Sequence, residues 1–170
     1  MNISYYHASK FGNGAAVAEE FKRQMAERGV SVSVYHVKRA APKALPPADL
    51  YVFSSPGRLG KPIGDMRKFL KKAVLPPGAP YAVIATEFQP DPAKRAEPDA
   101  EPGKCQRIIP VMNEILQLKG LTKVVAEKVY VTGLKGPLET GWEDKVQDVV
   151  ECLAGGFVIA GEEKAAALVS

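Results

Sequence analysis

Residues 2 to 25 read NISYYHASKFGNGAAVAEEFKRQM, and this stretch decides the fold. Its first five residues form a short apolar and aromatic run, which is typical of a β-strand. Apolar residues then recur every four positions from Val17 to Met25, which predicts a helix with one buried face. A polar loop from His7 to Asn13 lies between the two. A strand that leads through such a loop into a helix is the repeating unit of α/β folds.

The rest of the chain repeats this alternation. Further strands are predicted at residues 30–34, 50–53, 81–85 and 124–131, and further helices at residues 63–73, 108–116 and 142–153. Five strands linked by right-handed helical crossovers favour a three-layer, doubly wound parallel sheet with strand order 2-1-3-4-5. The second strand alternates valine with serine, so we expect it at a sheet edge.

The length of 170 residues predicts one domain with one hydrophobic core. An apolar fraction of 46% and a charged fraction of 25% are ordinary values for a globular protein. We expect residues 1–154 to form the domain. Gly155 and Gly156 are expected to end the last helix, which leaves residues 155–170 as a C-terminal tail.

Composition narrows the functional classes. The 23 Lys and Arg exceed the 19 Asp and Glu by only four and are spread along the chain, so no nucleic-acid partner is expected. No apolar run approaches the roughly 20 residues of a membrane span, and the first residues do not resemble a signal peptide. The expectation is a soluble cytoplasmic protein. Cys105, Cys152, His7 and His36 lack metal-ligand spacing, so no metal site is expected either.

In a sheet of this order, ligands bind beyond the carboxyl ends of the strands beside the switch point, between the first and third strands. The first loop there contains Ser9, Lys10, Phe11, Gly12, Asn13 and Gly14. Small residues before a helix expose backbone N–H groups to an anion, and the helix dipole favours negative charge there. The alternative is a plain turn in which Asn13 caps the helix. The Walker pattern for nucleoside triphosphates is absent.

Two more loops meet this edge. The second follows the third strand and contains Ser54, Ser55, Pro56, Gly57, Arg58, Leu59 and Gly60. Its nine residues through Pro62 exceed what a bare strand-to-helix connection needs, which favours a ligand. The third loop begins Thr86, Glu87, Phe88, where the phenylalanine offers an aromatic face to a planar ligand or packs in the core.

The order of elements and two of these loops resemble the flavodoxins over residues 1 to 154. In that family a hydroxyl-rich loop ending in Gly-Asn-Thr wraps the phosphate of FMN, and Ser9 to Gly14 is similar to it. The family's next loop begins Ser-Pro and continues to a Gly and a Pro, as Ser55 to Pro62 does. A third loop flanks the flavin ring, and by position it falls on Thr86 to Phe88.

The resemblance implies an FMN-binding flavoprotein in electron transfer or other oxidoreductase chemistry. It implies a redox partner protein, NAD(P)H or a quinone as partner, and the residues of the three loops as the cofactor site. Residues 87–104 form a long charged loop, which gives the chain some likeness to menaquinone-dependent protoporphyrinogen oxidase. Lys94, Arg95 and Lys104 in that loop are candidates for contacting an acidic partner, or else balance its acidic residues.

Phe11 and Gly14 stand where the family usually has hydroxyl residues. That departure keeps an alternative open, a flavodoxin-like module that has lost its cofactor and serves in binding or regulation. A nicotinamide-dependent reductase, with Lys38 and Arg39 meeting a 2′-phosphate, ranks last because the glycine spacing of that site fails.

Overall fold

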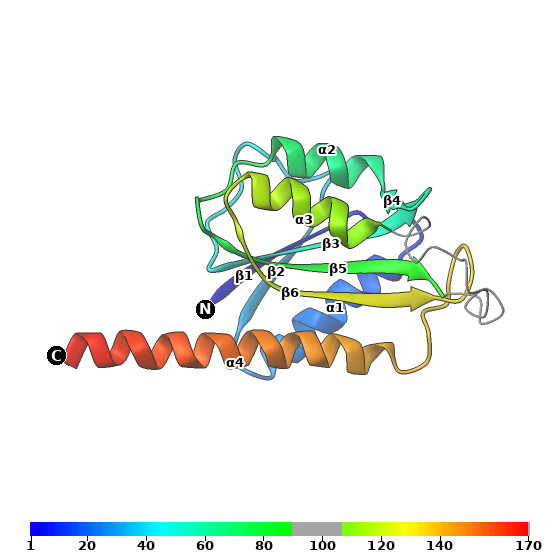
Figure 1. The fold of residues 1–170 in the computed structure, drawn as a ribbon. Helices are drawn as coiled ribbons and strands as arrows, with labels where there is room; N and C mark the ends of the chain where they lie inside the picture. Colours follow the sequence, from blue (N-terminus) through cyan, green and yellow to red (C-terminus); the bar gives the residue numbers. More distant parts are fainter. Residues whose placement is uncertain (90–106, 170) are drawn as a thin grey trace, which may run out of the picture.

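The computed structural model describes residues 1–89 and 107–169. Its strands are β1 (Asn2–His7), β2 (Ser31–His36), β3 (Leu50–Arg58), β4 (Lys61–Pro62), β5 (Pro80–Phe88) and β6 (Thr122–Val131). Its helices are α1 (Asn13–Ala26), α2 (Gly64–Lys72), α3 (Ile108–Leu118) and α4 (Trp142–Val169). The alternation predicted from sequence is therefore confirmed (Figure 1).

The strands form one sheet in the order β2-β1-β3-β5-β6, with β4 attached to β3. All neighbours along that path are parallel. The short strand β4 was not predicted, so β5 and β6 are the fourth and fifth of the predicted strands. The observed order is therefore the predicted order 2-1-3-4-5. β2 is an edge strand of this path, as its alternation indicated, and most of its residues are only half-buried.

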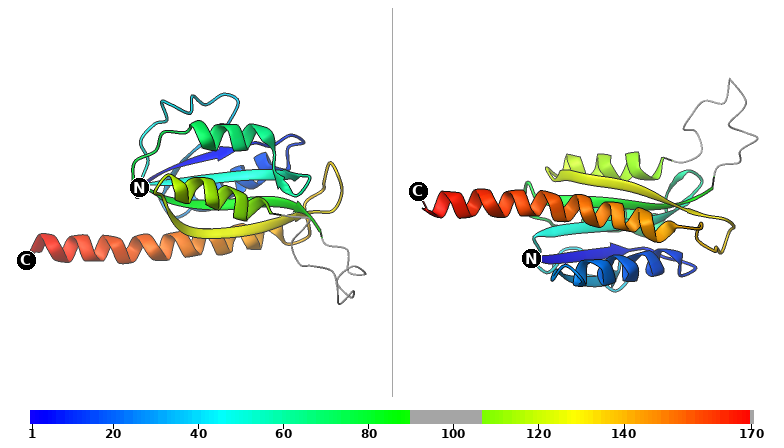
Figure 2. Two further views of the ribbon diagram at one scale, coloured as in Figure 1. Left: turned by 45° about the horizontal axis from the view of Figure 1, so that its top comes forward. Right: turned by 90° about the horizontal axis from the view of Figure 1, so that it is seen from below.

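Helices cover both faces of the sheet. Figure 1 shows α2 and α3 above it and α1 and α4 below it, and the turned views of Figure 2 show the same three layers. Neighbouring residues of a strand accordingly belong to different halves of the core. Tyr5 packs with Phe21 of α1, whereas Tyr6 stacks on Tyr35 and Phe53 on the other face.

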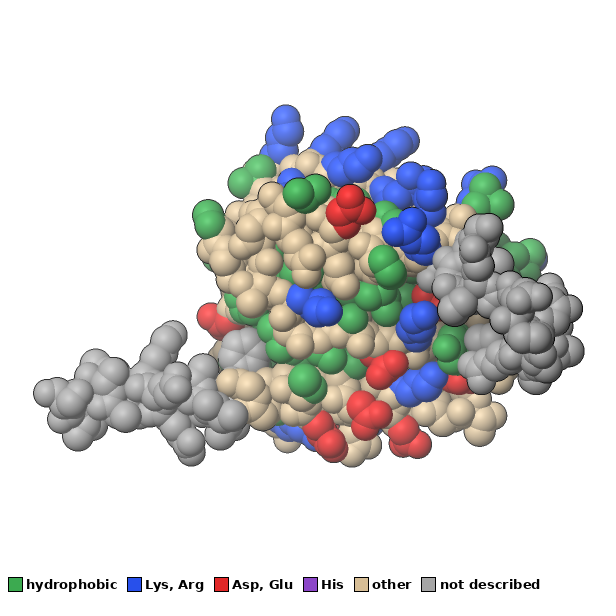
Figure 3. All heavy atoms as spheres, in the orientation of Figure 1, with side chains coloured by type: hydrophobic (Ala, Val, Ile, Leu, Met, Phe, Trp, Pro, Cys, Tyr) green, Lys and Arg blue, Asp and Glu red, His purple; other side chains and the backbone are tan. Residues whose placement is uncertain are grey.

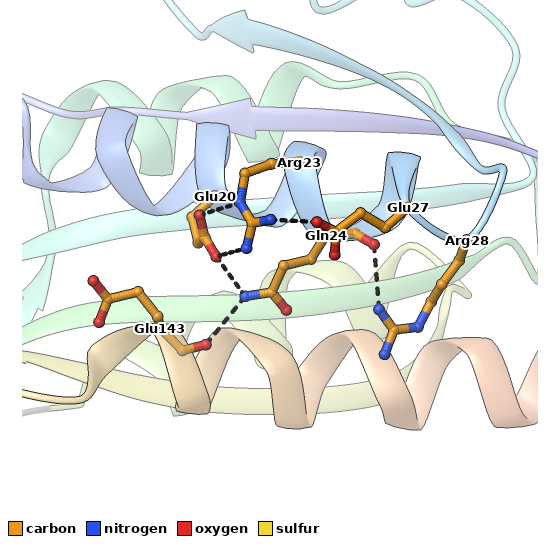
Figure 4. A network of polar contacts seen from close by, with 6 residues as sticks. All are labelled: Glu20, Arg23, Gln24, Glu27, Arg28 and Glu143. Carbon is orange, nitrogen blue, oxygen red and sulfur yellow. Dashed lines mark hydrogen bonds and ion pairs between the residues drawn. The ribbon is translucent and has the colours of Figure 1, made fainter.

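A polar network joins α1 to α4 (Figure 4). The amide Nε2 of Gln24, a buried residue, donates to Glu20 Oε1 at 2.7 Å and to the carbonyl oxygen of Glu143 at 3.2 Å. Arg23 bridges Glu20 and Glu27 on the solvent side of the same helix. The network ties the last turns of α1 to the first turn of α4.

The segment 54–62 differs from its prediction as a loop. Residues 54–56 continue the strand and pair with β5, and the chain then turns back at Leu59 and Gly60 to form a hairpin with β4. Both turn residues have positive φ, 53° and 74°, as a type I′ hairpin turn requires. A Pro-Gly pair is itself a common turn sequence, but here the left-handed positions lie three residues after Pro56-Gly57.

The last helix also runs further than predicted. Gly155 and Gly156 lie inside α4, so the expectation that they end the helix is wrong. Glycine inside a helix costs about 1 kcal/mol relative to alanine, but it stops a helix only where the chain leaves the right-handed region. The helix extends past the ends of the strands, on the side of the sheet where β1 begins (Figure 1). Within residues 1–89 and 107–169, no helix is long and apolar enough to cross a membrane.

Candidate functional site

A cavity of about 330 Å³ opens at the carboxyl ends of β1, β3 and β5. This volume falls within the range of small-molecule sites. The predicted residues that line it are Ser9, Lys10, Phe11, Asn13, Gly14, Pro56, Gly57, Arg58, Thr86, Glu87 and Phe88. The loop after β1 and the last residues of β3 and β5 therefore meet at the predicted edge. Residues 56–58 and 86–88 were predicted as loops but belong to these strands, because both strands run further than their apolar cores. That these residues bind a cofactor remains a prediction.

The other predicted residues do not line the cavity. Ser54 and Ser55 are buried in β3, where the Ser55 hydroxyl donates to the Pro56 carbonyl oxygen at 2.8 Å and accepts from Ile63 N–H at 3.3 Å. Leu59 and Gly60 form the hairpin turn instead. Gly12 is the N-cap of α1 and contributes backbone conformation. The two serines were expected as ligand donors because the strand was predicted to end before them.

Three lining residues were missed in the sequence. Ile63 precedes α2, Val131 ends β6, and Leu134 follows β6. The switch-point argument considered only the loops after the first, third and fourth strands. The signal available was the apolar character of Val131 and Leu134 directly at the end of the fifth strand.

The first loop presents backbone donors. Gly12 has φ 90°, its N–H donates to Ser9 Oγ at 3.0 Å, and its carbonyl oxygen accepts from Ala16 N–H at 2.9 Å. The N–H groups of Asn13, Gly14 and Ala15 find no acceptor in the part of the chain that the structure describes. The first turn of α1 has no acidic residue. The loop thus offers three amides and an uncompensated helix dipole to an anion.

Two histidines hold this loop in place. His7 Nδ1 accepts from Ser9 N–H at 3.3 Å, and the ring of His36 lies 5.0 Å from that of His7. His36 Nδ1 accepts from Lys38 N–H at 3.1 Å, so the proton of this neutral ring is on Nε2, which donates to the Ser9 carbonyl oxygen at 3.1 Å. Burial, with a smaller contribution from His36, lowers the pKa of His7. Both rings act here as hydrogen-bonded structure, in their neutral forms.

The loop after β6 closes against the start of α1. A Cβ atom at Gly136 would lie 2.7 Å from Asn13 Oδ1, and the φ of Gly136 is 102°. Only glycine allows this approach. Gly57 packs closely on α3, since a Cβ there would lie 2.5 Å from Cδ1 at the flexible end of the Ile108 side chain. Close packing therefore places α3 against the hairpin and the loop after β6 against Asn13.

Aromatic surface faces the cavity from two sides. Phe11 and Phe88 both line it and are 45% and 47% exposed. The ammonium groups of Lys10 and Lys135 lie 5.5 and 6.0 Å from the centre of the Phe11 ring. Exposed aromatic side chains in a cavity favour a planar ligand with a π-system.

A buried carboxyl group completes the lining. Glu87 is 2% exposed, its Oε2 lies 3.5 Å from Lys128 Nζ, and its Oε1 has no hydrogen-bond partner among the described residues. Burial raises the pKa of Glu87, and Lys128 opposes that shift. A buried acceptor without a partner in a cavity wall suits a ligand that brings an N–H or O–H group.

No protein-family model matches the chain, and no curated protein sequence matches it. Solved structures do. Flavodoxin 1 from Bacillus cereus superposes with a TM-score of 0.71 at 17% identity, over 91% of this chain and 98% of that one. The flavodoxin of Streptococcus pneumoniae TIGR4 gives 0.68 at 16% identity, over 92% and 99%.

This protein has the flavodoxin-like fold. The flavodoxin-like architecture also occurs as part of larger chains. Rubredoxin oxygen:oxidoreductase from Desulfovibrio gigas gives a TM-score of 0.63 at 10% identity, over 91% of this chain but 35% of that one. At such identities the likeness establishes the fold alone. The likeness to protoporphyrinogen oxidase stays a prediction, and Lys94, Arg95 and Lys104 lie outside the described residues.

Proposed function

We propose that this protein binds FMN in the cavity at the carboxyl ends of β1, β3 and β5 and functions in electron transfer. The observation that carries the proposal is that a helix N-terminus with three N–H groups free of acceptors among the described residues adjoins an aromatic-walled cavity at the switch point. FMN has both complementary parts, a phosphate and a flat ring. The flavodoxin-like neighbours support the proposal through their fold.

The residues present fit this cofactor. The N–H groups of Asn13, Gly14 and Ala15 would hold the phosphate, with the Ser9 hydroxyl beside them. Phe11 and Phe88 provide apolar surface for the ring, and Glu87 provides an acceptor for a ring N–H group. When bound, FMN takes up and releases electrons, which is chemistry that no side chain of the lining supplies.

The chain's own contribution is electrostatic. Arg58 lines the cavity with a positive charge, and the Glu87–Lys128 pair places a carboxyl group and an ammonium group beside it. Positive charge near the ring favours the reduced, more negative form of a cofactor, whereas the carboxylate opposes it. The backbone amides hold the phosphate without a change in protonation.

The first experiment is a visible absorption spectrum after FMN is added and excess is removed by gel filtration. We expect a retained flavin band and much weaker retention of riboflavin, which lacks the phosphate. Gly12→Ala should weaken FMN binding at least tenfold, because a Cβ at positive φ distorts the loop that aims the amides. Gly78→Ala is the matched control, since Gly78 also has positive φ and open space around it.

The alternative is a flavodoxin-like binding or regulatory module without a cofactor. Phe11, which lines the cavity where the family usually has a hydroxyl residue, is the observation that favours it. A protein that retains neither FMN nor riboflavin at high concentration would establish this alternative. If FMN is retained, NAD(P)H and quinones are the small-molecule electron donors and acceptors to test. Lys38 and Arg39 do not line the cavity, which weakens the nicotinamide-dependent alternative.

A further inference from the structure

The charges of the molecule are separated between its faces. From residue 38 to residue 72 the sequence has nine Lys and Arg against two Asp, whereas residues 142–156 have four acidic residues and one lysine. Figure 3 shows Lys and Arg side chains gathered over α2 and Asp and Glu side chains over α4. We define the basic face by six residues of α2, the β3–β4 hairpin and the loop after β2: Lys38, Arg58, Lys61, Lys68, Lys71 and Lys72.

Among the residues that the structure describes, one carboxylate pairs with the basic face. All six side chains are exposed. Lys38 Nζ lies 3.3 Å from Asp65 Oδ2, and in residues 1–89 and 107–156 no other carboxylate pairs with a residue of this face. Like charges crowded together repel one another and gain no stability. A surface with such an excess of positive charge is suited to a partner of opposite charge.

The basic face reaches the cavity. Arg58 belongs to both, and Lys61 is its partner across the hairpin. Between them, at the hairpin tip, Leu59 is 93% exposed and holds φ 53°, a left-handed conformation that is unfavourable for leucine. An apolar side chain surrounded by charged residues has the composition of a protein–protein contact, with an apolar centre and a polar rim.

A shallow hollow of about 200 Å³ lies within the basic face. Phe69 and Pro42 contribute apolar surface to it, and Lys38, Lys68 and Lys72 stand around it together with one carboxylate, that of Asp65, which pairs with Lys38. Such a hollow accepts a carboxylate side chain of a partner, whose stem lies on the apolar surface while its charge meets the lysines.

We infer that an acidic electron-carrier protein docks on the basic face, with its redox centre beside the cavity. This inference rests on the proposed function and adds the sign and position of the partner. With FMN bound in the cavity, such a carrier would give one electron to the cofactor and be oxidised, or would take one electron from the reduced cofactor and be reduced. The occupant is a protein, since the exposed leucine at the hairpin tip offers an apolar contact that a phosphate backbone cannot use.

The test measures binding directly, so it does not depend on electron transfer. An acidic [2Fe–2S] ferredoxin is the probe and basic cytochrome c is the control of opposite charge, each titrated calorimetrically. We expect ferredoxin to bind at about 0.02 M salt and to bind at least tenfold more weakly at about 0.3 M, while cytochrome c does not bind. Tighter binding of cytochrome c would overturn the inference.

Charge reversal locates the contact. The double variant Lys68→Glu/Lys72→Glu should weaken ferredoxin binding at least tenfold and leave FMN retention unchanged, since neither lysine lines the cavity. The double variant Lys22→Glu/Lys123→Glu makes the same change in net charge at exposed positions of α1 and β6, and binding should change less than twofold. Equal losses in the two variants would show a net-charge effect and refute a specific face.

Two further outcomes are separable. Lost FMN retention with normal ferredoxin docking would contradict the proposed function and leave the docking surface standing. A single-stranded DNA of 20 nucleotides that binds more tightly than ferredoxin, and loses binding in the Lys68/Lys72 variant, would assign the face to nucleic acid and overturn the inference.

Discussion

Glu87 is a buried carboxyl group in the wall of the cavity. Its carboxyl group is buried, and only Oε2 has a partner, Lys128, at 3.5 Å. A carboxyl group whose pKa is raised in the folded state binds protons more tightly there than in the unfolded chain. The contribution of Glu87 to folding stability is therefore greatest below its unfolded pKa of about 4.3. This contribution is lost as the pH rises through the folded pKa.

Glu87→Gln should accordingly stabilise the protein without ligand at neutral pH, by about 1 kcal/mol, because the neutral amide is cheaper to bury. Urea unfolding at pH 7 and near pH 4 measures it, and the gain should shrink at the lower pH. Glu127→Gln, a partly buried change on β6, is the control. An equal gain at both pH values would show that ionisation of Glu87 does not set its cost.

His7 gives the opposite pH dependence. Its folded pKa is lowered by burial and by His36, so the unfolded chain takes up the proton first as the pH falls. Stability from His7 is present above pH about 6.5 and is lost as the pH falls through the folded value. Protonation also removes the acceptor of Ser9 N–H, which should loosen the anion-binding loop.

In His7→Asn the amide oxygen can accept from Ser9 N–H but does not titrate. We expect this variant to lose less stability than the parent between about pH 7 and pH 5. Thermal unfolding across that range is the measurement. A parent and variant with parallel pH profiles would show that His7 contributes nothing to the acid sensitivity.

At the scale of elements, the sequence determines far more of the core than of the turns. Periodicity predicted the five strands of the parallel path because each alternates or repeats apolar residues that must be buried. The hairpin after β3 was not predicted, since Leu59-Gly60 is not among the usual Asn-Gly or Asp-Gly turn pairs. The run of α4 through Gly155-Gly156 was missed because a helix end was inferred from glycine alone.

The candidate site follows the same division. Phe11, Gly57 and Phe88 line the cavity because the sheet order brings the ends of β3 and β5 next to the loop after β1, and their role in binding a cofactor stays a prediction. Ser54 and Ser55 were misplaced by the undetected extension of β3. Val131 and Leu134 were missed because their apolar character, the one local signal, does not report where the chain after β6 lies relative to the other strand ends.

The hairpin turn carries measurable strain. Leu59 occupies the left-handed region at φ 53°, where glycine is favoured, and its side chain is almost fully exposed. Leu59→Gly should therefore stabilise the protein by about 1 kcal/mol, with Leu118→Gly, at an exposed position that ends α3, as the control that should destabilise it. Denaturant unfolding gives both values. If Leu59→Gly also lowers stability, the turn is not strained by its leucine.

At the scale of the whole molecule, the cavity lies beside the basic face. The electrostatic potential in the cavity therefore depends on charges beyond those that line it. Arg58 is both a lining residue and the part of the basic face nearest the cavity. Opposite charges attract over about 10 Å at about 0.1 M salt. A cation at this position would therefore stabilise the negative charge that a bound cofactor gains on reduction.

Arg58→Glu should lower the midpoint potential of bound FMN by on the order of 60 mV, a tenfold change in a one-electron equilibrium. Spectroelectrochemical titration measures it, and Lys123→Glu, at an exposed position at the start of β6, is the matched control that should change the potential much less. Raising the salt concentration should reduce the shift, because the guanidinium group is exposed and its field is screened. A shift that does not respond to salt would indicate a changed contact with the ring, and an unchanged potential would mean that the guanidinium group points away from it.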